Sequence, residues 1–227
     1  MEDIFINRES WLIRTMPHLS PAELEALDVE LASASDDEVG KALVGSVRWN
    51  SFNAQARLTK RLVPRASQTH RNEALAQVAY ALLRSPALVY GEHFDVLDTL
   101  LAAGAQPDWS SAEIPTPALH ALACKYSSTS LSAPRKALLK KYAKLTARAD
   151  AVFALALQKC RQLDFADVNG WTALHHAVLN SQITRVEQLV AAGANRALKT
   201  NQGLDAVALA HQSPSAALTA VLAALGK

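Results

Sequence analysis

The stretch between Asp167 and Ala210 decides the fold. It begins Asp-Val-Asn-Gly-Trp-Thr-Ala-Leu-His-His-Ala at 167–177, continues Val-Glu-Gln-Leu-Val-Ala-Ala-Gly-Ala-Asn at 186–195, and ends Gly-Leu-Asp-Ala-Val-Ala-Leu-Ala at 203–210. Four residues return after a step of 33 positions, in the pairs Gly170 and Gly203, Ala177 and Ala210, Leu189 and Leu222, and Gly193 and Gly226. Return at a fixed period of this size is the mark of a repeat architecture.

The residues of this stretch predict two short helices joined by a turn. Thr172 is a natural N-cap, because its hydroxyl can satisfy a free N–H of the first helical turn. Gly170 suits a turn position with positive φ, and Gly193 ends the second helix at the usual C′ position. Apolar residues recur at helical spacing in both helices, as Leu174, Ala177 and Val178 and then as Ile183, Val186, Leu189 and Val190. A helix pair of this size cannot bury its own apolar face, so it must stack on neighbouring pairs.

This stretch resembles the ankyrin repeat. The family's opening, Gly-x-Thr-Pro-Leu-His-x-Ala, appears as Gly170, Thr172, Ala173, Leu174, His175 and Ala177, and its ending, Leu-Leu-x-x-Gly-Ala, appears as Leu189, Val190, Gly193 and Ala194. The resemblance implies an all-α solenoid that binds another macromolecule, and a structural role for His175 in the turn network. The alternative for His175 is a metal-ligand role together with His176, for which no third ligand is evident nearby in the sequence.

Two earlier segments are divergent versions of the same unit. Leu-Leu-Ala-Ala-Gly-Ala at 100–105 repeats the family's ending, and Pro-Thr-Pro-Ala-Leu-His-Ala-Leu-Ala at 115–123 repeats its opening with one extra residue. The step from His120 to His175 is 55 residues, which is one period plus 22. We therefore expect divergent repeats over 69–227 with an insertion around 127–144. Within it we expect a loop at 127–134 and an extra or extended helix at 135–145, followed by a helix at 149–159.

Residues 1–68 read as helical but lack the repeat signature. Helices are expected at 2–16, from Pro21 to about Leu31, from Asp36 onward, and over about 52–63. Ser20 before Pro21 is a strong helix start, and the acids from Asp36 suit the positive end of a helix dipole. The segment is predicted to be a helical N-terminal cap or a set of degenerate repeats. A cap is needed because the apolar face of a terminal repeat, left exposed to solvent, would promote aggregation.

Composition limits the class of protein. Half of the 227 residues are apolar and the period-two alternation of strands is absent, so the chain is expected to be all-α. Two cysteines, Cys124 and Cys160, are too few for a disulfide framework and are predicted to be buried thiols in a cytoplasmic protein. The acidic N-terminus does not read as a secretory signal, and no apolar run approaches the roughly 20 residues that span a bilayer.

Charge is distributed unevenly along the chain. Residues 1–38 carry a net charge of −8, so the remainder carries +10. A basic cluster coincides with the insertion and consists of Lys125, Arg135, Lys136, Lys140, Lys141, Lys144 and Arg148. One interpretation of this cluster is a docking surface for an acidic partner or for nucleic acid. The other, which we favour, is a solvated face above an ordinary apolar stripe. Nucleic acid is the less favoured partner because no DNA- or RNA-reading motif accompanies the cluster. A smaller basic run, Arg57, Lys60, Arg61, Arg65 and Arg71, could equally face the acidic N-terminus.

The loop tips are the second candidate for partner binding. The resemblance implies that partners meet the tips between repeats and the inner helices, which here means Asp108, Trp109, Phe165, Asp167, Asn169, Trp171 and His176. Exposed aromatic residues at such tips would be hot spots, because Trp dominates interface energetics. Trp109 lies in a long polar loop and is predicted to be the more exposed of these two tryptophans. Trp171 is either exposed at its tip or packed against the adjacent repeat.

Enzymatic chemistry has little support in the sequence. There is no Gly-rich phosphate loop, no nucleophile elbow and no metal-spaced cluster, so no cofactor, metal or small-molecule substrate is predicted. His120 and Cys124 lie one helical turn apart, but both fall in the repeat's structural box. The sequence therefore predicts a non-enzymatic module that acts as an inhibitor or adaptor for one protein partner, for example a bacterial toxin-immunity protein. The alternatives are an effector that binds host proteins, a nucleic-acid binder that uses the basic insertion, and an enzyme with an unrecognised site.

Overall fold

The computed structural model describes residues 21–48, 56–84, 91–124, 136–212 and 218–226. Regular structure in these ranges is entirely helical, as expected from the composition. The expected helix at 2–16 and the loop at 127–134 lie outside the described residues. The helices are α2 (Pro21–Ser33), α3 (Asp36–Arg48), α4 (Ala56–Leu62), α5 (Gln68–Arg84), α6 (Gly91–Ala102), α7 (Ala118–Ala123), α8 (Lys136–Lys159), α9 (Ala173–Leu179), α10 (Ile183–Ala191), α11 (Ala206–Gln212) and α12 (Leu218–Ala224).

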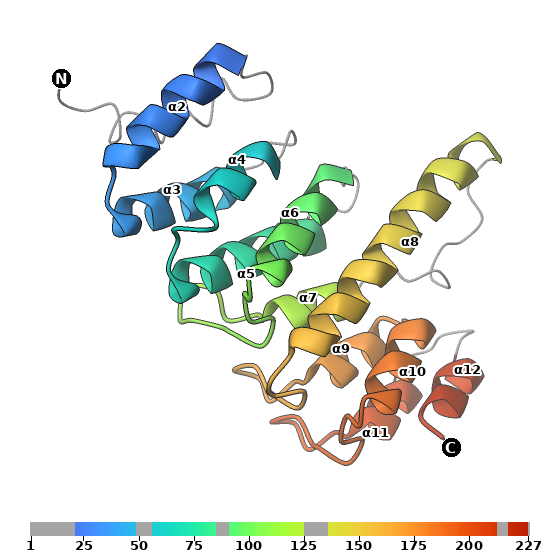
Figure 1. The fold of residues 1–227 in the computed structure, drawn as a ribbon. Helices are drawn as coiled ribbons and strands as arrows, with labels where there is room; N and C mark the ends of the chain where they lie inside the picture. Colours follow the sequence, from blue (N-terminus) through green and yellow to red (C-terminus); the bar gives the residue numbers. More distant parts are fainter. Residues whose placement is uncertain (1–20, 49–55, 85–90, 125–135, 213–217, 227) are drawn as a thin grey trace.

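The helices form a solenoid of stacked pairs (Figure 1). From α3 onward, each odd-numbered helix packs against the even-numbered helix that follows it. The odd-numbered helices also pack in series from α3 to α11, while α4, α6 and α8 form a second layer that α10 and α12 continue. Each pair buries its apolar face against its neighbours, which is why the hydrophobic core runs along the whole stack rather than forming one central cluster.

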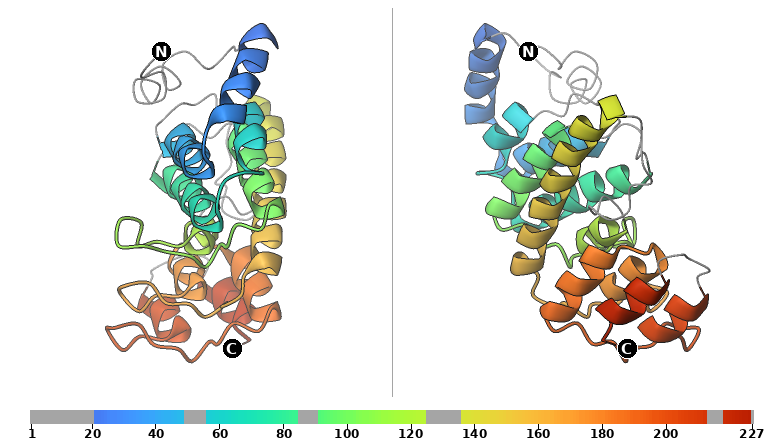
Figure 2. Two further views of the ribbon diagram at one scale, coloured as in Figure 1. Left: turned by 60° about the vertical axis from the view of Figure 1, so that its left-hand side comes forward. Right: turned by 90° about the vertical axis from the view of Figure 1, so that its right-hand side faces the viewer.

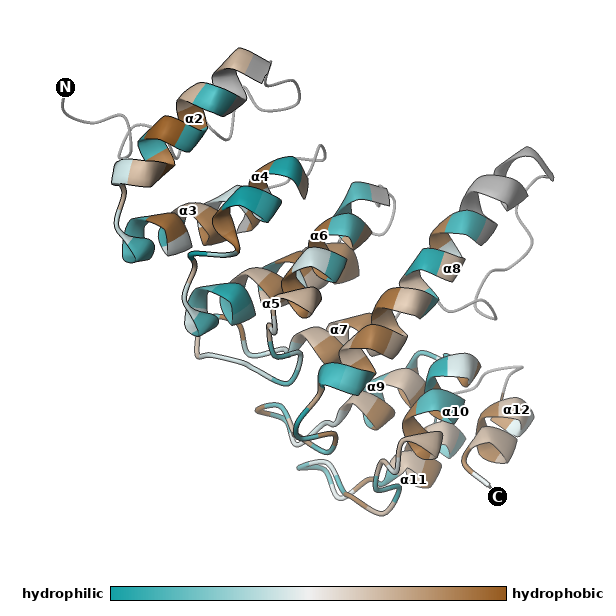
Figure 3. Cartoon of the chain, in the orientation of Figure 1, coloured by the Kyte–Doolittle hydropathy of each residue, from teal (hydrophilic) through white to brown (hydrophobic). Residues whose placement is uncertain are grey.

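The core is apolar and dense in the short inner helices. Nearly every residue of α7 and α9 is buried, and Figure 3 shows the hydrophobic colour of α7, α9 and α11 against mostly hydrophilic loops. The largest side chains of the core come from the outer layer, where Phe94 of α6 and Phe153 of α8 are fully buried. Small residues such as Ala177 let the inner helices approach closely, so a core with few aromatic residues still excludes water.

The insertion lengthens one helix. Residues 136–145 and 149–159, which the sequence suggested as separate segments, belong to the single helix α8 of 24 residues, against 9 residues in α10. Helix α8 runs diagonally past α6 and α7 (Figure 1). Of the two alternatives for this segment, the structure therefore has the extended helix.

The N-terminal helices α3 and α4 stack on α5 and α6 as the later pairs stack on one another. A capping box starts α3, with the Ser35 N–H donating to the Glu38 carboxylate at 2.7 Å. Part of the smaller basic run faces the acidic N-terminal segment, because Arg61 pairs with Asp28 at 2.8 Å and Arg65 with Asp36 at 2.8 Å. The division of the chain at residue 68 remains a prediction.

Candidate functional site

Three loops project on the same side of the solenoid (Figure 2, left). They span 103–117, 160–172 and 192–205, each joining an outer helix to the next inner helix. The second and third loops turn at Gly170 and Gly203, whose φ values of 75° and 77° favour glycine. The backbone N–H of Asn201 donates to the carbonyl of Asn169 at 3.1 Å, so the tips of these two loops are tied together.

His175 joins the inner helix α9 to the third loop. Its Nδ1 accepts a hydrogen bond from the backbone N–H of Thr172 at 3.0 Å, and its Nε2 donates to the carbonyl of Leu198 at 3.0 Å. The ring is buried, and burial lowers its pKa. Both ring nitrogens are used within the fold, so the structural role expected for His175 fits the geometry and its metal-ligand alternative does not.

His120 holds the same position one repeat earlier but has only half of that network. Its Nε2 donates to the carbonyl of Phe165 at 3.0 Å, which matches the bond from His175 to Leu198. Its Nδ1 has no hydrogen-bond partner among the described residues, because Pro117 stands where Thr172 stands in the next repeat and has no N–H to donate. Burial, followed by the nearby His176, lowers the pKa of His120 to about 3.

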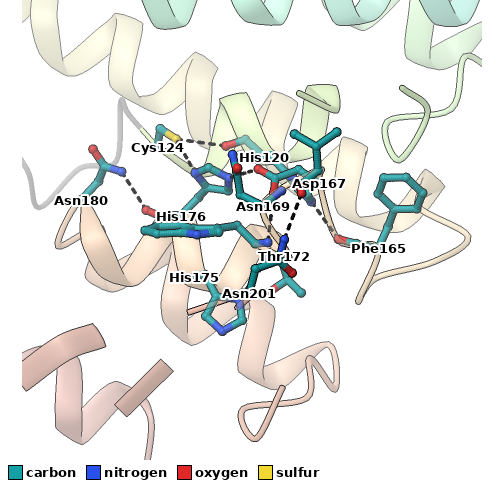
Figure 4. Close-up of polar contacts among 12 residues, drawn as sticks. His120, Cys124, Phe165, Asp167, Asn169, Thr172, His175, His176, Asn180 and Asn201 are labelled. Carbon is teal, nitrogen blue, oxygen red and sulfur yellow. Dashed lines mark hydrogen bonds and ion pairs between the residues drawn. The ribbon is translucent and has the colours of Figure 1, made fainter. Parts of the chain in front are cut away.

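A cluster of polar side chains lies between α7 and the loop that precedes α9 (Figure 4). His176 Nε2 is 3.1 Å from Asp167 Oδ2, and His176 Nδ1 is 3.7 Å from Cys124 Sγ. Asp167 Oδ1 accepts from the backbone N–H groups of Asn169 and Trp171 at 2.9 and 3.0 Å. One possible ligand atom each from His120, Asp167 and His176 lies within 4.8 Å of the others. We call His120, Cys124, Asp167 and His176 the histidine cluster.

The cluster's electrostatics favour an ionised carboxylate beside neutral rings. Burial raises the pKa of Asp167, but hydrogen bonds from the Trp171 and Asn169 N–H groups and from His176 outweigh it, so the pKa lies below its ordinary value. Burial lowers the pKa of His176 more than Asp167 raises it. The Cys124 thiol, the His176 imidazole and the Asp167 carboxylate stand in the order found around an activated cysteine nucleophile. Access by a substrate is poor, however, because Cys124 is only 4% exposed and its thiol also donates to the His120 carbonyl at 3.2 Å.

A comparison with protein families decides the nature of this segment. The family model described as the ankyrin repeat matches residues 169–201. This segment is an ankyrin repeat. No curated protein matches the chain. Ankyrin repeats are protein-interaction modules and are typically non-enzymatic. In the described ranges, no helix combines the length and the apolarity needed to cross a membrane.

The predicted tip residues lie on the first loop, before α7, and on the second loop, before α9, except for His176, which lies on α9. Asn169 is exposed, while Asp108, Trp109, Phe165 and Trp171 are half-buried. The Asp108 carboxylate accepts from the Gln162 N–H at 3.0 Å and so joins the first loop to the second. Trp109 and Trp171 both fall in the half-buried range, so the expectation that Trp109 is the more exposed of the two stays a prediction. Trp171 lies against the rings of His175 and His176, with ring centroids 6.3 and 5.3 Å apart.

The structure describes the side chains of two residues of the basic cluster, Lys144 and Arg148. Lys136, Lys140 and Lys141 lie on α8, but their side chains are outside the described part of the structure, as are Lys125 and Arg135. Lys144 is exposed. Arg148 pairs with Asp95 at 2.6 Å and Asp98 at 2.9 Å, and these carboxylates raise its pKa. Arg148 therefore fastens α8 to α6.

Sequence reasoning missed two residues. Val168, at the tip of the second loop, is 73% exposed, although its apolar type between Asp167 and Asn169 was a visible signal. Arg185 of α10 is fully buried and pairs with Asp150 of α8 at 2.8 Å, with its guanidinium 4.4 Å from the Phe153 ring centroid. An arginine in an amphipathic helix gives no sign of such burial, since most lie at the surface.

Proposed function

We propose that the chain is a non-enzymatic binding module that covers a site on one protein partner and acts as an inhibitor or adaptor. The observation that carries this proposal is the set of three loops on one side of the solenoid. The second loop presents Val168 and Asn169 to solvent, with the half-buried Phe165 and Trp171 beside them. An exposed apolar residue on a rigid, polar-rimmed tip is the usual composition of a partner surface.

The rigidity of the tips supports the same proposal. The Asn201 side chain donates to the Val168 carbonyl at 3.1 Å, in addition to its backbone bond to Asn169, so the second and third tips move as one unit. A preformed surface loses little conformational entropy when it binds. A standard interface needs about 800 Å² from each partner, and the three tips lie on one side of the solenoid, where a single partner could meet all of them.

A cytoplasmic immunity protein that neutralises a toxin is a concrete version of this function. Its charged surfaces support it, and the thiols of Cys124 and Cys160, which are not joined in a disulfide, suit a reducing compartment. An effector that binds host proteins would use the same tips. Nucleic-acid binding would use Lys144 and its neighbours on α8, and its affinity would fall steeply with added salt.

Affinity co-purification from native lysate, followed by mass spectrometry, tests the proposal. Wild type is compared with Trp109→Ala in the first loop and with Val29→Ala, a control at an exposed position of α2. One dominant protein that is lost only with Trp109→Ala would support binding at the tips. A protein retained by every variant would move the surface to the inner helices or to α8. Recovery of no protein partner would overturn the proposal.

A further inference from the structure

We propose that His120, Asp167 and His176 bind a divalent transition metal ion, with Zn²⁺ as the expected ion. The three residues come from two successive helix pairs, since His120 lies on α7 and the others lie in the loop before α9 and on α9 itself. One ligand atom from each is within 4.8 Å of the other two. Two imidazoles and a carboxylate are a ligand set that zinc uses when it keeps a fourth coordination position open.

Asp167 and His176 already stand at a suitable separation. Their Oδ2 and Nε2 atoms are 3.1 Å apart, and two ligands on a tetrahedral zinc ion are about 3.3 Å apart. When the ion takes the place of the proton between them, the proton of His176 resides on Nδ1, which faces Cys124 Sγ at 3.7 Å. The other carboxylate oxygen of Asp167 stays fixed by the Asn169 and Trp171 N–H groups. Such outer contacts orient metal ligands.

His120 supplies the third ligand because its ring is held on one side only. Its Nε2 bonds to the Phe165 carbonyl at 3.0 Å, while its Nδ1 is buried and has no hydrogen-bond partner among the described residues. Nδ1 can therefore serve as the ligand atom while Nε2 keeps its hydrogen bond to Phe165. His175 has the opposite situation, since Thr172 and Leu198 occupy both of its nitrogens.

The expected consequence is a cross-link between successive helix pairs. The ion would join α7 to the second loop, next to Val168 and Asn169. Solvent would fill the fourth position and reach it past His176, whose side chain is the most exposed of the three at 19%, against 8% for Asp167. Nitrogen ligands favour zinc and neighbouring transition metals over Mg²⁺ and Ca²⁺, which prefer oxygen.

The test is calorimetric titration of Zn²⁺ into the full chain after removal of metal with a chelator. Wild type should bind one ion with a dissociation constant of about 1 µM or tighter. Asp167→Asn keeps an acceptor for the loop N–H groups but removes the charge, and His176→Ala removes a ligand. Each should weaken binding about tenfold or more. His211→Ala, at an exposed histidine of α11, is the matched control and should leave the affinity within about twofold.

Several results would overturn the site. One is a folded wild-type chain that binds no zinc near 1 µM. Another is equal affinity in wild type, Asp167→Asn and His176→Ala, each confirmed as folded by circular dichroism. A third is loss of zinc binding in His211→Ala with native circular dichroism, because His211 is placed outside the ligand set. The wild-type titration decides the question even where a variant fails to fold, and it needs no knowledge of the protein partner.

Discussion

Three histidines show how neighbouring residues decide the chemistry of one side chain. His175 has both ring nitrogens hydrogen-bonded, His120 has one, and His176 stands between a carboxylate and a thiol. Burial is the largest cause of a lowered pKa in all three. Folding therefore favours the neutral rings, and a fall in pH must weaken the folded state.

The loss of stability should begin near the ordinary histidine pKa. The folded pKa of His120 is about 3, against 6.5 when the ring is free. Its contribution is complete above pH 6.5 and is lost as the pH falls toward 3, since the unfolded chain binds the proton first. Between pH 7 and 5 this loss is about 2 kcal/mol, and His175 and His176 add to it. His120→Gln, which cannot titrate, should reduce the pH dependence of the urea-unfolding free energy by about that amount. An unchanged pH dependence would contradict the assignment.

Gly170 and Gly203 offer a matched pair of residues in equivalent turns. Their φ values are nearly equal, but a Cβ at Gly170 would lie 2.8 Å from the backbone nitrogen of Asn201, whereas a Cβ at Gly203 would meet no atom within 4 Å. Gly203→Ala should cost about 1 kcal/mol for the left-handed conformation alone. Gly170→Ala should cost at least about 1 kcal/mol more than Gly203→Ala, because the added Cβ forces the second and third loop tips apart. Equal costs in urea unfolding would show that the two tips are not in contact.

Residue roles could be predicted from the sequence only where the partners lie within one motif. Thr172 and His175 are three positions apart, so the turn network was readable from the ankyrin-like opening. The contact of His120 with Asp167 and His176 could not be predicted, because these residues belong to successive repeats that are separated by an insertion in the sequence. The Phe165 carbonyl that His120 contacts is 45 positions away, against 23 for His175 and Leu198. The difference of 22 is the length of the insertion.

At the scale of the element, α8 is fastened by charge at two places. Arg148 faces Asp95 and Asp98 of α6 at a partly exposed site, whereas Arg185 reaches Asp150 from α10 at a buried one. Helical spacing predicted helices at 135–145 and 149–159 and left open whether the first was an extra helix or an extension, whereas the structure has one helix over 136–159. It also could not tell these arginines from solvated ones, because their partners lie on other helices. Charge counted along the chain therefore included Arg148, which is paired within the fold, in the basic cluster.

The two ion pairs should differ in their contribution to stability. Asp150→Ala leaves the Arg185 guanidinium buried without its carboxylate, which should cost about 3 kcal/mol. Asp98→Ala leaves Arg148 with Asp95 at a site where both carboxylates are more than two-fifths exposed, which should cost about 0.5 kcal/mol or less. Urea unfolding of both variants measures the contrast. Equal losses would mean that the Arg185 pair is as well solvated as the surface pair.

At the scale of the whole molecule, the solenoid separates stability from binding. The hydrophobic core lies between the helix layers, while the loop tips contribute few buried apolar side chains. Substitutions at the tips should therefore change affinity with little effect on folding. Two valines far apart along the stack test this separation, because Val168 on the second loop and Val29 on α2 are each 73% exposed.

Val168→Asp places a charge at the tip proposed to meet the partner, and Val29→Asp places the same charge far from it. Both variants should unfold within about 0.5 kcal/mol of wild type, because neither side chain is buried. Val168→Asp should weaken binding of the captured partner about tenfold or more, because the new carboxylate loses its water at the interface. Val29→Asp should leave that affinity unchanged. Titration calorimetry with that partner gives both affinities. Weaker binding with Val29→Asp alone would place the partner on the N-terminal helices, because the two substitutions differ only in where the charge stands.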